Sequence, residues 1–193
     1  MKTFELKGSL RTDLGKKAAK SLRKDSDIPA VIYGGENSKT AIHFTVSNSD
    51  VRKLIYTPEI FLVNLNLDGT EYKAILKDIQ FHPVSDAILH LDFLHVFESK
   101  PIIIDVPVVL EGLAEGVKAG GKLSLDLRKL KVKASYDKVP EQLHINISHL
   151  ALGKSIQVGE LDFDGLELLN AKNAVVCRVQ LTRAARGLAA KGK

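Results

Sequence analysis

Hydrophobic and polar positions alternate with the period of β-strands over most of the chain. Near the start, Phe4, Leu6 and Leu10 alternate with polar residues, as in a half-buried strand. The same period predicts further strands at 30–33, 42–46, 61–67, 71–76 and 87–96. Asp68-Gly69 separates two of these runs and is the strongest short signal for a β-hairpin.

Two short segments have helical spacing instead. Ala18, Ala19 and Leu22 are spaced for a helix, and lysine or arginine fills most other positions between 16 and 24. A helix this short is marginal in water without packing. Ser49 is the expected N-cap of a second helix with an apolar inner face.

The alternation of hydrophobic and polar residues stops near Lys100-Pro101 and begins again after it, so we place a domain boundary there. Strands then follow at 102–110, 123–127, 130–134, 143–147 and 174–181. Short sequential strands with few long helices predict a mainly β fold, an antiparallel barrel or sandwich, and not a doubly wound sheet. The predicted domains are residues 1–97 and 98–183, followed by a basic tail at 184–193.

Composition narrows the setting. The 193 residues are 45% hydrophobic and 26% charged, which is typical of a globular protein. The single cysteine, Cys177, excludes an intrachain disulfide framework and fits a reducing compartment. The start, MKTFELKGSL, has no apolar region of a secretory signal, and no run approaches the roughly 18 apolar residues of a membrane span. We therefore expect a cytoplasmic protein.

Positive charge is concentrated at one end of the sequence. The first 24 residues contain eight cations and two acids, a larger excess than the net charge of +5 for the whole chain. A localised basic patch is a footprint for a polyanion such as RNA, because its cations displace counterions from phosphates. A solvated helix face is the alternative. The patch leads into Tyr33-Gly34, where the tyrosine either stacks on a base or is a half-buried core residue.

The segment His90-Leu91-Asp92-Phe93-Leu94-His95 suggests a second contact. Strand alternation places His90 and Asp92 on one face, opposite Leu89, Leu91, Phe93 and His95. Three ligands on this strand cannot converge on one ion, so we predict no metal. His90 and Asp92 should instead point outward as a donor–acceptor pair for base edges or 2′-hydroxyl groups.

Support for catalysis is thin. Cys177 lies in an apolar strand without a paired base. The sequence has neither a Gly-x-Ser-x-Gly elbow nor a phosphate loop. We predict no enzyme activity, no cofactor and no small-molecule substrate.

Several motifs together resemble one family. Arg11, GKKAAKSLRK, IPAVIYG and HLDFLHV, in that order and spacing, resemble the amino-terminal domain of the bacterial large-subunit ribosomal protein L twenty-five family. The segments PVVLEGLAEGVKAGGKLSLDLRKLKVKA and VPEQLHINISHLALGKSIQVGEL resemble the added domain of its long form, the general stress protein CTC. The resemblance covers nearly all of residues 1–183.

This resemblance implies a structural ribosomal protein whose first domain, a small β-barrel with helices, binds 5S rRNA. 23S rRNA and other large-subunit proteins would be further neighbours. The RNA contacts implied by the motifs are Arg11, Lys16 or Lys17, Lys20, Arg23, Tyr33, Gly34, His90 and Asp92. Two other classes stay open: a generic β-barrel module that binds tRNA, and a metal-dependent hydrolase using His82, His90 and Asp92.

Overall fold

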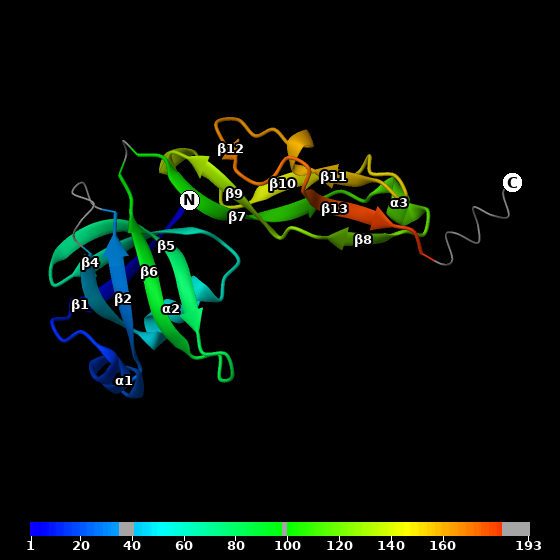
Figure 1. Ribbon diagram of the computed structural model, residues 1–193. Helices are drawn as coiled ribbons and strands as arrows, with labels where there is room; N and C mark the ends of the chain where they lie inside the picture. Colours follow the sequence, from blue (N-terminus) through cyan, green and yellow to red (C-terminus); the bar gives the residue numbers. More distant parts are fainter. Residues whose placement is uncertain (35–40, 98–99, 183–193) are drawn as a thin grey trace, which may run out of the picture. The chain divides into compact units, whose positions relative to one another are not determined.

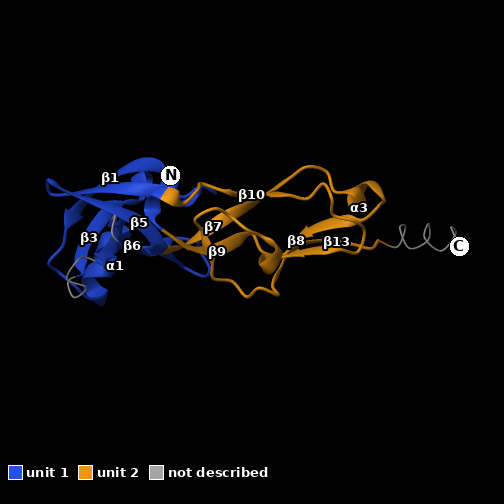
Figure 2. Ribbon diagram, turned by 90° about the horizontal axis from the view of Figure 1, so that it is seen from above, with its two compact units in different colours: residues 1–102, 135–137 blue, residues 103–134, 138–193 orange. Residues whose placement is uncertain are grey.

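The computed structural model describes residues 1–34, 41–97 and 100–182. The chain divides into two compact units, one of residues 1–102 with 135–137, the other of residues 103–134 and 138–193 (Figure 2). The predicted basic tail at 184–193 lies outside the described residues. Within them, each helix is too short or too polar to cross a lipid bilayer.

Six strands of the first unit close into a barrel in the order β1-β3-β2-β6-β5-β4 (Figure 1). The strands and helices of this unit are β1 (Lys2–Leu10), α1 (Lys16–Lys24), β2 (Asp27–Tyr33), β3 (Ile42–Ser47), α2 (Asn48–Ile55), β4 (Phe61–Leu67), β5 (Thr70–Phe81) and β6 (Ile88–His95). The prediction of a mainly β fold with an N-terminal barrel and short helices is confirmed.

The barrel is mixed, whereas an antiparallel barrel was expected. β1 pairs in parallel with β4, and β2 pairs in parallel with β6. The other four neighbouring pairs are antiparallel. Alternation along a strand identifies its buried face but carries no information about its neighbour, so the sequence pattern could not distinguish the two arrangements.

A local signal accounts for the turn between β4 and β5, but not for the start of α2. Asp68 and Gly69 have φ angles of 48° and 94°, as a two-residue hairpin turn between β4 and β5 requires. The expected N-cap at Ser49 is wrong, because α2 begins at Asn48 and Ser47 occupies the capping position. The hydroxyl oxygens of Ser47 and Ser49 lie 2.9 Å apart, so Ser49 interacts with the cap from inside the helix.

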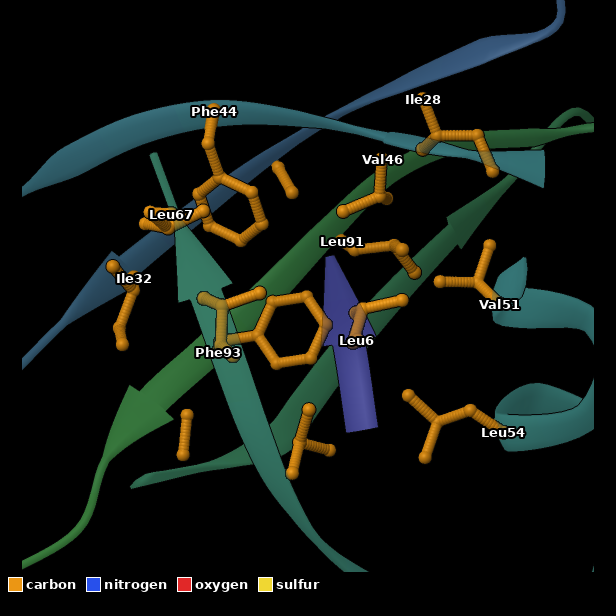
Figure 3. Packing of buried hydrophobic residues seen from close by; sticks show 14 of the residues in the cluster. Leu6, Ile28, Ile32, Phe44, Val46, Val51, Leu54, Leu67, Leu91 and Phe93 are labelled. Atoms are coloured by element: carbon orange, nitrogen blue, oxygen red, sulfur yellow. The ribbon is translucent and has the colours of Figure 1, made fainter. Parts of the chain in front are cut away.

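The core of the barrel is made by the inward-facing residues of all its strands. Phe44 and Phe93 are fully buried, and their ring centroids lie 5.7 Å apart (Figure 3). Val51 and Leu54 of α2 point into the same cluster. Because apolar side chains fill the interior of the barrel, the polar residues of the same strands lie on its outer surface.

The second unit contains two sheets. The elements after β6 are β7 (Ile102–Glu111), α3 (Glu115–Lys118), β8 (Lys122–Leu125), β9 (Lys129–Ala134), β10 (Leu143–Asn146), β11 (Ser155–Gln157), β12 (Glu167–Leu168) and β13 (Val175–Gln180), with 3₁₀ turns at Tyr136–Lys138 and Val158–Glu160. Of these residues, 102, 136 and 137 are grouped with the first unit. One sheet has the order β10-β7-β9-β12 and the other β11-β13-β8. The sequence pattern missed β11, β12 and α3. The two strands have three and two residues, and the four residues of α3 make about one helical turn, so none of them is long enough to show its period.

Candidate nucleic-acid interface

His90 and Asp92 form a pair on the outer surface of β6. Leu91 and Phe93 are fully buried, so the alternate residues His90 and Asp92 face away from the core. The Nδ1 atom of His90 lies 2.6 Å from Oδ1 of Asp92. Both side chains remain partly exposed, at 27% and 28%. The predicted outward donor–acceptor pair is thus present, with its two members also bonded to each other.

Leu89 departs from the predicted alternation. The register of β5 and β6 shifts here, so that Phe81 aligns with Ile88 and Gln80 with His90, leaving Leu89 without a partner on β5. Ile88 is buried and Leu89 is only half-buried, so Ile88 occupies the core position expected for Leu89. A β-bulge of this kind changes the direction in which the neighbouring side chains point.

The carbonyl oxygen of Leu89 joins the basic helix to β6. It accepts hydrogen bonds from Nε and Nη2 of Arg23, at 3.0 and 2.9 Å. Arg23 lies in the last turn of α1, which packs beside β2 (Figure 1). This contact places the cationic helix next to His90, although the two segments are more than 60 residues apart in sequence.

Tyr33 lies within electrostatic range of the same surface. Burial raises the pKa of the Tyr33 phenol, and the negative charges of Asp92 and Asp78 raise it further. Asp78 was not among the predicted site residues. It aligns with Asp92 across β5 and β6. Alternation from the inward-facing Ala74 and Leu76 would turn Asp78 inward. Only the register shift between Leu76 and Asp78 leaves Asp78 exposed and aligned with Asp92.

Gly34 follows Tyr33 and ends β2 with a φ of 92°, a conformation that favours glycine. A Cβ atom at this position would also lie 2.8 Å from a methyl group of Leu94. Both constraints explain the glycine without reference to a ligand. The next residue, Gly35, lies outside the described residues.

The remaining predicted contacts belong to α1 and the loop before it. Lys16, Lys17 and Lys20 are exposed on a helix that has no buried residue. Arg11 curls back onto its own loop, and its Nε and Nη2 donate to the carbonyl oxygen of Asp13 at 3.2 and 2.8 Å. A groove of about 400 Å³ runs here, lined by Leu10, Arg11, Thr12, Asp13, Ala18, Ser21, Leu22 and Thr45.

His82 does not join His90 and Asp92. Its Nδ1 accepts hydrogen bonds from the backbone N–H groups of Val84 and Ser85, at 3.3 and 3.2 Å, and so shapes the loop between β5 and β6. Over residues 1–34, 41–97 and 100–182, no group of three or more His, Cys, Asp or Glu side chains is arranged to hold a metal ion. The hydrolase alternative therefore has no assembled site in this part of the chain.

Comparison with known proteins covers both units. Residues 6–93 match the model of the Ribosomal L25p family, and residues 101–183 match that of the C-terminal domain of ribosomal protein TL5. The large ribosomal subunit protein bL25 of Porphyromonas gingivalis is 64% identical over 192 residues, which is 99% of each chain. The same protein of Parabacteroides distasonis is 62% identical over 197 residues, the full length of both chains.

A third relative, bL25 of Bacteroides thetaiotaomicron, is 57% identical over 98% of each chain. Identity at this level along the whole length confirms the resemblance seen in the motifs. It also confirms a structural, non-catalytic role in the ribosome. The chain therefore belongs to the long form of the bacterial bL25 family, structural constituents of the large ribosomal subunit that associate with ribosomal RNA.

Proposed function

We propose that the barrel, within residues 1–97, binds 5S rRNA as its specific partner. The observation that carries this proposal is the bidentate bond from Arg23 to Leu89, which fixes the cationic helix beside the His90–Asp92 pair. Cations alone would attract any polyanion. A carboxylate held among them is unfavourable for phosphate binding but accepts hydrogen bonds from base amino groups and 2′-hydroxyls.

The proposed contacts fall into two groups. The first group neutralises phosphates and consists of Lys16 or Lys17, Lys20 and Arg23. The second group contacts bases or riboses and consists of Tyr33, His90 and Asp92. Arg11 and Gly34 are included on the family motif, and both have local structural roles as well. Residues 98–183 form a second domain that faces neighbouring 23S rRNA or large-subunit proteins.

The deciding experiment is to crosslink the full chain to RNA in cells and sequence the RNA recovered. We expect 5S rRNA to be enriched over tRNA and over other ribosomal RNA. In purified form, the chain should retain 5S rRNA in the presence of excess tRNA at physiological salt. Recovery of mixed tRNA without 5S rRNA would instead identify a generic RNA-binding barrel.

A further inference from the structure

β3 lies between the loop that holds Arg11 and the strands β2 and β6, which carry Tyr33 and Asp92. On one side, the backbone N–H of Arg11 donates to the carbonyl oxygen of His43 at 3.1 Å. On the other side, His43 is aligned with Val31 of β2, and Val31 with Asp92 of β6. His43 therefore occupies the interval between the loop that begins the basic segment and the carboxylate of β6.

The side chain of His43 faces outward. Its strand neighbours Phe44 and Val46 are buried, at 0% and 2% exposure, and alternation sends His43 to the opposite face. Val31, between the buried residues Ala30 and Ile32, faces the same way. With neighbouring strands about 4.8 Å apart, the backbone positions of His43 and Asp92 are separated by roughly 10 Å.

The imidazole of His43 is available for a ligand. Two other histidines of this unit have defined partners, since His90 is bonded to Asp92 and His82 to its own loop. Among the described residues, the His43 side chain has no hydrogen-bond or ion-pair partner. It is partly buried.

We propose that His43 contacts the bound RNA directly, donating or accepting a hydrogen bond at a base or ribose. This inference rests on the proposed function and extends its surface across β3. An imidazole provides both a donor and an acceptor, together with a flat ring that can stack on a base. Its position makes the RNA footprint continuous from Arg11 to Asp92, where the family motifs gave two separate segments.

The test uses the full chain with purified 5S rRNA and tRNA at fixed salt. We expect His43→Ala to weaken 5S rRNA binding roughly fivefold to a hundredfold, the range of one base contact, with tRNA binding unchanged. His43→Gln keeps a donor and an acceptor and should retain more affinity than His43→Ala. The matched control is His149→Ala, an exposed histidine of the second unit, which should bind as wild type.

Three readouts separate the outcomes. The thermal midpoint of His43→Ala should stay close to that of wild type, because the His43 side chain faces away from the core. Chemical footprinting should show lost protection at nucleotides adjacent to those lost with Asp92→Asn. If His43→Ala binds 5S rRNA as wild type does while Asp92→Asn is weakened, the role of His43 is wrong and the proposed function stands. If wild type does not distinguish 5S rRNA from tRNA, the proposed function fails, and the same titration still shows whether His43 touches RNA.

Discussion

Asp78 on β5 is aligned directly opposite Asp92 on β6, so two carboxylates lie side by side on the outer surface of the barrel. Like charges placed opposite each other on adjacent strands oppose folding, by roughly 0.2–1 kcal/mol. His90 offsets part of this cost for Asp92 but has no contact of this kind with Asp78. Two facing carboxylates do not contribute to the stability of the barrel, so their presence is better explained by binding than by folding.

The first prediction concerns Asp78. Asp78→Asn removes one of the two facing charges, so the free energy of unfolding should rise by roughly 0.2–1 kcal/mol. Urea unfolding at low salt measures this gain, and high salt should reduce it because the repulsion is screened. Asp105→Asn, at an exposed position of β7, is the control and should change stability little. A loss of stability in Asp78→Asn would contradict the argument.

Asp92→Asn should weaken specific RNA binding. Asparagine replaces one of the two acceptor oxygens with an NH2 donor and removes the negative charge, and the loss of one base-reading contact costs roughly 1–3 kcal/mol. Titration against 5S rRNA in excess tRNA measures the change. Equal or tighter binding by the variant would show that the carboxylate does not contact RNA.

Arg23 should have two separable effects. Arg23→Ala removes a cation and the bonds to Leu89, so RNA affinity should fall and the salt dependence should flatten by about one unit of slope. Arg23→Lys keeps the charge but loses the two-point contact. It should keep the wild-type salt slope while the fold loses roughly 0.5–1.5 kcal/mol. Identical unfolding curves for Arg23→Lys and wild type would show that the contact is not maintained in solution.

Burial is the larger cause of the raised pKa of Tyr33, and the negative charge of Asp92 adds to it. This pKa should lie above the ordinary value of 10.0, and Asp92→Asn should lower it while leaving the larger effect of burial in place. Because the folded state holds this proton more tightly, the unfolded state releases it first as pH rises. Stability should therefore decline above about pH 10, less so in Asp92→Asn. Phenolate absorbance during a pH titration, with Tyr33→Phe to assign the signal, provides the measurement.

Ser26 follows the end of α1 with a φ of 67°, in the left-handed region that glycine adopts without strain. That conformation costs roughly 1–2 kcal/mol for an L-residue, and the greater chain entropy of glycine offsets about half of this. Ser26→Gly should therefore raise the free energy of unfolding by roughly 0.5–1 kcal/mol. Ser26→Ala is the matched control and should give no gain in the thermal midpoint.

The sequence could predict which faces are buried but not which strands are neighbours. Alternation correctly put Leu91 and Phe93 inside and His90 and Asp92 outside. It failed at Leu89, because a bulge is a property of two strands and is not visible in one. The contacts of Leu89 with Arg23 and of His43 with Arg11 join distant segments, so no local pattern contained them.

The parallel pairing of β2 with β6 also sets an order of events during synthesis. All the cations of the basic helix are present once residue 24 has been made, but Asp92 lies beside Val31 only after the final strand of the barrel, β6, has paired with β2. Contacts between such distant segments form late in folding. A growing chain would thus attract RNA through charge before it could select any, and selectivity would arise in the same step that completes the domain.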